Sequence, residues 1–174
     1  MTNTVTPPGQ IAPTEDFLNN GVKVWESMIA GTTIGQMLGH TPKAMEALYA
    51  NGYALFGQGK YDQAQKAFGA LLLCNHLDRR FYKGYAACMQ MQGQHTEAIK
   101  YYVLCATLDV CDPEPVFHAA ECMLALGKRD EARASIEHLL EMPARDERDA
   151  KIQSRAKGLM EVLNGATTPT PASQ

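Results

Sequence analysis

The sequence of 174 residues lacks a strong excess of charge, a long apolar run and any sign of an export signal. Its net charge is -3 and it has no basic stripe, which argues against a nucleic acid partner. No segment reaches the roughly 18 apolar residues of a membrane helix, so we expect no membrane insertion. The N-terminus has no charged start followed by an apolar run, so we expect the protein to remain in the cytoplasm.

Signatures of catalysis are also missing. The sequence contains no glycine-rich phosphate loop, nucleophile elbow or HExxH motif. The five cysteines are odd in number and form no C-x-x-C pair, so we expect reduced thiols that pack as small core side chains. We therefore expect a protein that is not an enzyme and that needs no cofactor.

Two pairs of side chains could still carry chemistry. His118 and Cys122 lie four apart on one expected helix, a spacing that can share a metal, but no third and fourth ligand lies nearby in the sequence. We expect no metal site there, with His118 hydrogen-bonded and Cys122 packed. Cys74 and His76 lie two apart and would not face each other on a helix, which leaves His76 an edge or capping position.

The feature that the sequence does have is an internal period of 34 residues. Glycine recurs at one point of the period, alanine at a second and a bulky side chain at a third. This pattern is typical of tetratricopeptide helix–turn–helix repeats. It predicts an all-α protein with three such repeats in a right-handed solenoid, N-terminal helices and a C-terminal capping helix. The recurring residues are Gly59, Gly93 and Gly127, then Ala64, Ala98 and Ala132, then Phe68, Tyr102 and Ile136.

The period also predicts how the chain is divided. Each first helix should end at its glycine, and Thr41-Pro42, Asp78 and Asp112-Pro113 read as helix starts. Prolines, threonines and asparagine make both ends look disordered. The expected segments are a disordered N-terminus at 1–13, N-terminal helices at 14–44, the repeats at 45–146, a capping helix at 147–163 and a disordered tail at 164–174.

In this architecture the first helices of the repeats line a concave groove, and residues three or four apart share one face. The three aromatic residues of repeat one either belong to the core or face the groove. We favour the groove because Leu48, Gly52 and Leu55 already fill the buried positions, and an aromatic row suits an apolar peptide. The expected groove residues are Tyr49, Tyr53, Phe56, Lys83, Ala87, Gln90, Phe117 and Glu121, with His76 at the edge.

A carboxylate clamp is a second possible use of such a groove. Clamps of this kind grip an acidic C-terminus with lysine and asparagine side chains from the groove helices. Here repeat one offers Tyr49 and Tyr53, and repeat two offers Lys83 beside Ala87, where a polar side chain is needed. The composition of the groove therefore favours an apolar peptide over a terminal carboxylate.

Three longer strings carry a resemblance to a known family. GKYDQAQKAF, LDRRFYKGYAACMQMQGQHTEAIKYY and FHAAECMLALGKRDEA resemble the class II chaperones of bacterial type III secretion systems, over roughly residues 20–142. The resemblance implies a cytoplasmic chaperone that keeps hydrophobic, pore-forming translocator proteins soluble and apart before secretion. It implies that a segment near the translocator N-terminus lies extended in the groove, against Tyr49, Tyr53, Phe56, Lys83 and Phe117.

The family often forms homodimers through the N-terminal helix or the first repeat, which here assigns Phe17, Val22, Trp25 and Ile29 to a dimer contact. An alternative with the same fold is a generic repeat scaffold in a bacterial secretion or envelope complex, without a secreted client. Genes for translocators and secretion components beside this one would favour the chaperone. The sequence leaves open which translocator is the client.

Overall fold

The computed structural model describes residues 21–24, 26 and 29–165, and within these ranges every regular element is a helix. The expected all-α fold is thereby confirmed. The expected disordered segment 1–13 lies outside the described residues, and α9 extends two residues beyond the predicted end at 163. The helices are α2 (Ile34–Met37), α3 (Pro42–Gly57), α4 (Tyr61–Cys74), α5 (Arg79–Met91), α6 (His95–Leu108), α7 (Pro113–Ala125), α8 (Arg129–Glu141) and α9 (Glu147–Gly165).

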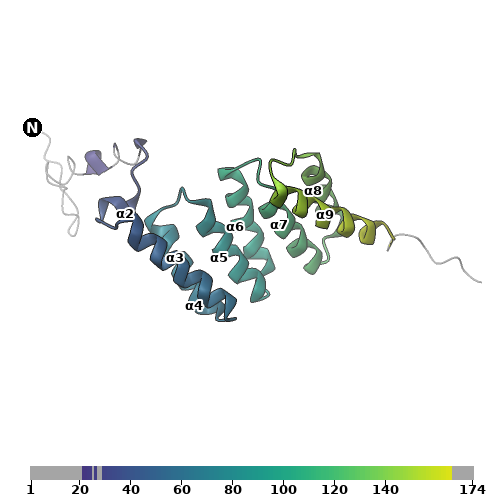
Figure 1. The fold of residues 1–174 in the computed structure, drawn as a ribbon, viewed down its shortest axis with the longest axis horizontal. Coiled ribbons are helices and arrows are strands. Elements are labelled where there is room, and N and C mark those ends of the chain that lie inside the picture. Colours follow the sequence, from purple (N-terminus) through teal and green to yellow (C-terminus); the bar gives the residue numbers. More distant parts are fainter. Residues whose placement is uncertain (1–20, 25, 27–28, 166–174) are drawn as a thin grey trace, which may run out of the picture.

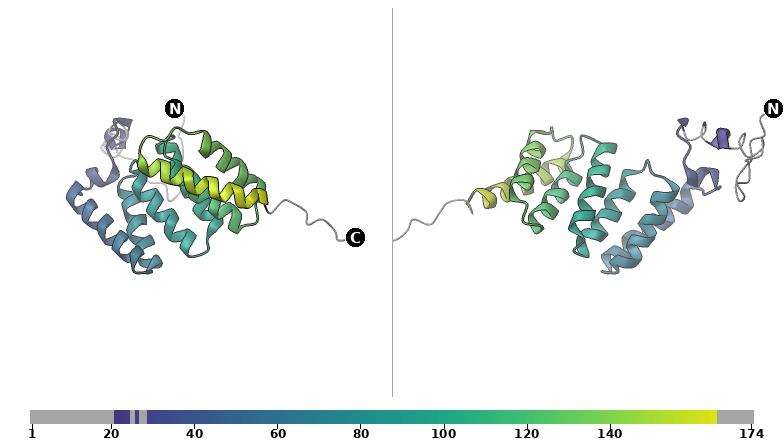
Figure 2. Two further views of the ribbon diagram at one scale, coloured as in Figure 1. Left: turned by 45° about the vertical axis from the view of Figure 1, so that its right-hand side comes forward. Right: turned by 180° about the vertical axis from the view of Figure 1, so that it is seen from behind.

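The helices stack as three pairs in chain order, α3 with α4, α5 with α6 and α7 with α8 (Figure 1). Figure 2 shows the same row from two further sides, with α9 against the last pair. From α3 onward each helix packs against its neighbours in the chain, α2 packs against α4, and α9 packs against both α7 and α8. A solenoid of this kind has a separate core between each pair of repeats, so every repeat depends mainly on its neighbours.

The starts of three helices follow from local capping. Thr41 accepts a hydrogen bond from the backbone N–H of Ala44, and Pro42 takes the first helical position of α3. Asp78 and Asp112 cap α5 and α7 in the same way, through the backbone N–H two residues further on. Each cap satisfies a backbone donor that has no partner inside its helix. These three predicted helix starts are confirmed.

The turns within the pairs depend on glycine. Gly59, Gly93 and Gly127 each adopt a φ of 75°, the left-handed region that other residues rarely enter. The backbone N–H of each glycine donates to a carbonyl in the last turn of the helix before it. The chain thereby reverses direction within a few residues, as the 34-residue spacing predicted.

Close approach of paired helices depends on small residues. Ala64, Ala98 and Ala132 are all 0% exposed at the contacts between paired helices. On the first helix of repeat one, a Cβ added at Gly52 would lie 3.2 Å from the ring of Phe68, so the side chain there must be small. The helix axes can therefore approach closely, and the bulky side chain four residues after each alanine fills the space beside the contact.

We expect Ala98→Leu to lower the free energy of unfolding by about 1–3 kcal/mol, because three extra carbons must enter a packed contact. Ala98 is 0% exposed and lies in one core cluster with Ala86 and Tyr102. Urea denaturation followed by circular dichroism measures the loss. Ala54→Leu, on the exposed side of α3, is the control and should change the stability by less than about 0.5 kcal/mol. An unchanged midpoint for Ala98→Leu would contradict the assigned helix packing.

Candidate functional site

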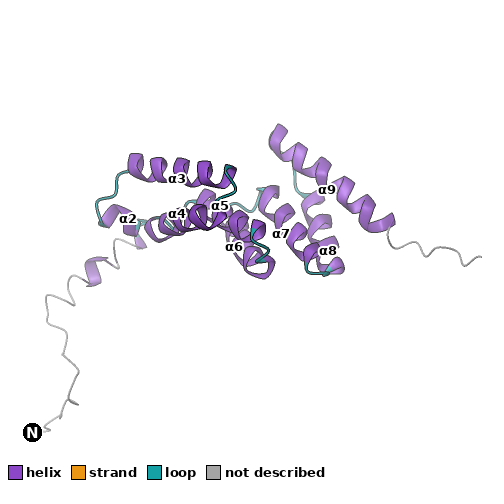
Figure 3. Ribbon diagram, turned by 90° about the horizontal axis from the view of Figure 1, so that it is seen from below, coloured by secondary structure: helices purple, strands orange, loops and turns teal. Residues whose placement is uncertain are grey.

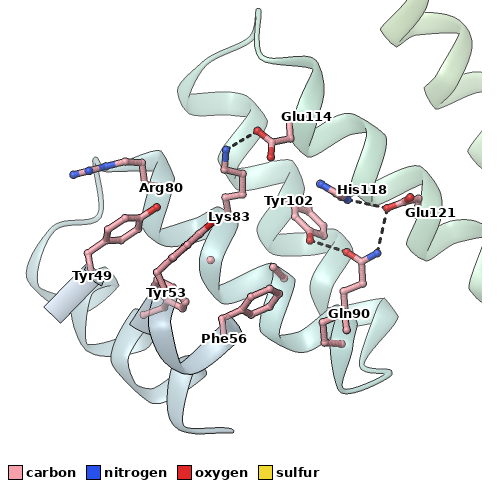
Figure 4. A pocket seen from close by; sticks show the side chains of 14 residues that line it. Tyr49, Tyr53, Phe56, Arg80, Lys83, Gln90, Tyr102, Glu114, His118 and Glu121 are labelled. Carbon is pink, nitrogen blue, oxygen red and sulfur yellow. Dashed lines mark hydrogen bonds and ion pairs between the residues drawn. The ribbon is translucent and has the colours of Figure 1, made fainter. Parts of the chain in front are cut away.

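A cavity of about 370 Å³ lies between α3, α5 and α7. Most of its lining comes from these first helices of the three repeats, and the second helices contribute Phe68 and Tyr102 from below. Figure 4 shows aromatic side chains of α3 on one side and a hydrogen-bonded polar group on the other. The 34-residue register therefore brings seven predicted groove residues to one cavity: Tyr49, Tyr53, Phe56, Lys83, Ala87, Gln90 and Glu121.

The aromatic side of the cavity combines core and surface. Tyr49 packs edge-on against Phe68, with ring centroids 5.8 Å apart, and burial raises the pKa of its hydroxyl despite the nearby Arg80. Phe56 is half-buried and contacts the Tyr61 ring at 5.3 Å. Tyr53, in contrast, is 67% exposed. Both interpretations of the aromatic row thus hold in part, since two rings also support the core and the third is free to contact a ligand.

The floor of the cavity requires a glycine. Gly84 of α5 lies directly above the Phe68 ring, and a Cβ added at this glycine would meet ring carbons at 2.7–2.8 Å. Real side chains do not pack this closely, so α5 can lie against Phe68 only because position 84 has no side chain. The result is a smooth apolar floor between Lys83 and Ala87.

The polar side of the cavity is a chain of hydrogen bonds centred on Glu121. The Tyr102 hydroxyl donates to Gln90 Oε1 at 2.7 Å, and Gln90 Nε2 donates to Glu121 Oε2 at 3.4 Å (Figure 4). His118 Nδ1 lies 2.8 Å from the same carboxylate oxygen, and its ring stacks on Tyr102. Because these side chains hold one another in place, they present a preorganised set of donors and acceptors to the cavity.

Both carboxylates of this wall are held in their charged form. Burial alone would raise the pKa of Glu121, but the hydrogen bond from His118, assisted by Gln90 and Arg155, outweighs burial and lowers it. Burial likewise opposes ionisation of Glu114, yet the hydrogen bond from Lys83 Nζ at 2.7 Å and the charge of Arg148 lower its pKa. Lys83 is therefore committed to Glu114, which leaves it poorly placed to clamp a ligand carboxylate.

Two predicted groove residues do not line this cavity. Phe117 is only 3% exposed, because Arg155 of α9 covers its ring at 4.4 Å and it packs into the core with Ile136 and Ile152. Phe117 therefore does not line the cavity that Tyr53 lines, and its assignment to the client groove stays a prediction. His76 is exposed in the loop between α4 and α5 and does not belong to the cavity lining.

Sequence reasoning missed four members of the cavity that carry a polar or charged group: Arg80, Tyr102, Glu114 and His118. Arg80 and Glu114 are themselves 34 residues apart, so the register contained a signal for a further groove row. In the sequence, Tyr102 was identified only as the recurring bulky residue of its repeat. Its hydroxyl was the available signal, because a buried tyrosine hydroxyl needs a partner and repeats one and three place Phe68 and Ile136 there.

Three buried cysteines are unsuited to nucleophilic chemistry. Burial raises the pKa of the Cys88 thiol to about 12 and those of Cys105 and Cys122 to about 11, so these thiols stay protonated at neutral pH. Cys122 is packed beside a His118 that is hydrogen-bonded to Glu121, as the sequence predicted for this pair. In the described ranges, no three histidine, cysteine or acidic side chains lie close enough to hold a metal ion.

Comparisons with known proteins agree with this geometry. A family model for the tetratricopeptide repeat matches residues 81–109. The low calcium response locus protein H of Yersinia pestis is 33% identical over 133 residues, which cover 76% of this chain and 79% of that protein. A type III secretion complex from Aeromonas hydrophila matches with a TM-score of 0.78 and 31% identity, over 83% of this chain and 97% of that one. SycD of Yersinia enterocolitica, solved with a peptide of the translocator YopD, matches with a TM-score of 0.69 and 32% identity, over 74% and 98% of the two chains.

The stacked helix pairs and the cavity between their first helices define a tetratricopeptide-repeat protein with a groove of peptide size. The relatives make the assignment more specific: the chain belongs to the family of type III secretion translocator chaperones. Members of this family are chaperones and not enzymes. Among the helices of the described part of the chain, none has both the length and the apolar character that crossing a membrane requires.

Proposed function

We propose that this protein holds an extended segment near the N-terminus of a hydrophobic translocator in its groove, in the bacterial cytoplasm. It thereby keeps the pore-forming translocators soluble and apart before secretion. The single observation that carries the proposal is the cavity of about 370 Å³ with an aromatic side on α3 and a hydrogen-bonding side on α7. SycD, a relative with 32% identity, was solved with a translocator peptide, which supports the same use of the groove here.

The two sides of the cavity match the two needs of an extended peptide. An extended segment has unpaired backbone N–H and C=O groups, and Gln90, His118 and Glu121 offer polar partners for them. Its apolar side chains can pack on Tyr53 and Phe56, which give large contact areas with little rotamer entropy to lose. The client loses conformational entropy on binding, so moderate affinity and later release are expected.

We further propose that the free protein forms a homodimer through the N-terminal segment 14–44. Val22 is 54% exposed and Ile29 is 72% exposed, and apolar side chains so exposed favour contact with a second copy. The other two residues assigned to this contact, Phe17 and Trp25, lie outside the described residues. SycD also forms a dimer in a further solved structure. The repeats at 45–146 would then carry the client, and the helix predicted at 147–163 would cap the solenoid.

Co-expression with a hydrophobic translocator of the same bacterium tests the proposal. We expect the translocator to be found in the soluble fraction and to co-purify with this protein, whereas translocator expressed alone should aggregate. Limited proteolysis of the complex should leave a protected fragment from near the translocator N-terminus. A translocator that stays insoluble, with no protected fragment, would refute the chaperone assignment and favour the generic scaffold.

A further inference from the structure

A second hollow, of about 460 Å³, lies between α7 and α9. Its apolar lining comes from both helices, with Phe117 and Leu124 on α7 and Leu159 and Val162 on α9. Val162 is 67% exposed, which is a large exposed fraction for a branched aliphatic side chain within a helix. The hollow is therefore an open apolar surface next to the groove and not part of the closed core.

The hollow meets the groove cavity at Glu121, which lines both. One carboxylate oxygen of Glu121 belongs to the hydrogen-bonded wall of the groove, and the other accepts from Arg155 Nη2 of α9 at 3.4 Å. The Arg155 side chain is 53% exposed and lies over the Phe117 ring. The boundary between the two hollows is thus a pair of side chains at the surface, across which an extended chain can pass.

The repeat register extends into α9. Arg155 follows Glu121 by 34 residues, and Gly158 follows Leu124 by 34, as Leu124 follows Gln90. α9 therefore takes the place of the first helix of a fourth repeat. Its Arg155 and Gly158, which are the register equivalents of Glu121 and Leu124, line the hollow. Figure 3 shows α3 at one end of the row and α9 at the other, with α5 and α7 between them.

Packing does not explain the glycine at position 158 of α9. A Cβ added there meets no heavy atom within 4 Å, so no neighbour requires a glycine. Glycine inside a helix is unfavourable relative to alanine, because it loses more backbone entropy on folding. An unfilled position of this kind in the lining of an apolar hollow leaves room for a side chain from another molecule.

We propose that α9 is a fourth helix of the client groove, and that the hollow between α7 and α9 binds a further apolar side chain of the same extended client segment. This inference rests on the proposed function. It assigns α9 a direct role in client binding, beyond ending the solenoid.

Charge and continuity determine what this site accepts. The lining offers the apolar surfaces of Leu124, Leu159 and Val162, which suit an aliphatic side chain. The absence of a side chain at position 158 leaves space for it. The only charges of the lining, Glu121 and Arg155, already pair with each other, so a charged client side chain gains no free partner there. The client backbone crossing this pair can donate to the carboxylate and accept from the guanidinium.

Gly158→Leu tests the site, because a Cβ at this position meets no heavy atom within 4 Å and the leucine side chain then takes up space in the hollow that Gly158 lines. Gly158→Ala is the matched control, since it removes the same glycine and leaves most of the hollow open. The probe is the protease-protected fragment of the co-expressed translocator, synthesised with a fluorescent label at full length and in versions shortened stepwise from each end. Fluorescence anisotropy gives the affinity of each variant for each peptide.

We expect Gly158→Leu to weaken binding of the full fragment about tenfold, the order for one buried aliphatic side chain. It should leave the affinity for one of the shortened peptides unchanged, and Gly158→Ala should bind every peptide as the wild type does. Equal affinities of the wild type and a folded Gly158→Leu for the full fragment would overturn the α9 site alone. Absence of any binding to the wild type would overturn the proposed function as well. Tighter binding after removal of residues 166–174 would make the chain's own tail the occupant of the hollow and would also overturn the proposal.

Discussion

Replacing Ala87 by tryptophan should weaken client binding about 100-fold while leaving the chain folded. Ala87 is half-buried in the middle of α5 and lines the cavity between the aromatic side and Glu121. An indole placed there occupies much of a cavity of about 370 Å³, so the client side chain that would bind at this point is displaced. Loss of one central anchor in an interface typically costs about 2–4 kcal/mol, and 2.7 kcal/mol corresponds to about 100-fold.

The measurement is the affinity for the labelled, protease-protected translocator fragment. Ala54→Trp is the control, because it adds the same indole to an exposed position of α3 outside the cavity and should bind as the wild type does. Thermal denaturation of both variants establishes that they fold. Wild-type affinity in a folded Ala87→Trp would show that the client does not use the cavity.

Much of the fold was predictable because its signals are local. The glycine turns require a positive φ, and Gly59 and its equivalents adopt it. The caps at Thr41 and Asp112 need only an oxygen before a helix start. The small residues at the helix contacts recur at a fixed period, which identified positions such as Ala98 as buried without knowledge of the other helices.

The differences between the expected and the observed cavity lining come from contacts that no local pattern encodes. Phe117 occupies the same register position as Tyr49 and Lys83, and from the repeat alone it should share their exposure. It is instead buried, because α9 packs against α7 and places Arg155 over its ring. A capping helix was predicted from the repeat architecture, but the architecture does not say which face of the preceding repeat the helix covers.

The polar wall was missed for a related reason. Each member looks ordinary in the sequence, and the wall exists only because Tyr102 reaches Gln90 from below while His118 and Glu121 approach from the next repeat. Hydrogen bonds between repeats depend on side-chain length and rotamer, which a 34-residue period does not determine. Register therefore indicates which residues can face a groove, and packing of neighbouring helices decides which of them do so and how they combine there.

The largest loss of stability is expected from Asp112→Ala, about 3 kcal/mol. Asp112 is 1% exposed and has two tasks. One carboxylate oxygen accepts from the backbone N–H of Glu114 and caps α7 at 3.1 Å, and the other accepts from Arg79 at 2.6 Å and Arg148 at 3.4 Å. A lost cap costs about 1 kcal/mol, and hydrogen bonds to charged groups contribute about 1.5–3 kcal/mol.

Thermal denaturation should detect this loss as a decrease in Tm of roughly 6–12 °C, at 2–4 °C per kcal/mol for a chain of this size. Asp112→Asn separates the two tasks, because asparagine caps a helix as well as aspartate does but carries no charge. We expect about half the loss from it. A decrease in Tm below about 2 °C for Asp112→Ala would show that Asp109, the second carboxylate paired with Arg79, is sufficient alone.

The position of Asp112 also predicts where the loss should appear. Its partners come from α5 and α9, so this one carboxylate joins the second repeat to the last helix across the start of the third. Stability in a solenoid is set by nearest neighbours, so α3 and α4 should keep their protection while α7 to α9 lose theirs. Amide hydrogen exchange of Asp112→Ala measures this directly. Equal loss of protection in α3 and α9 would mean that the repeats unfold as one unit and that the pairing at Asp112 does not hold the C-terminal end in place locally.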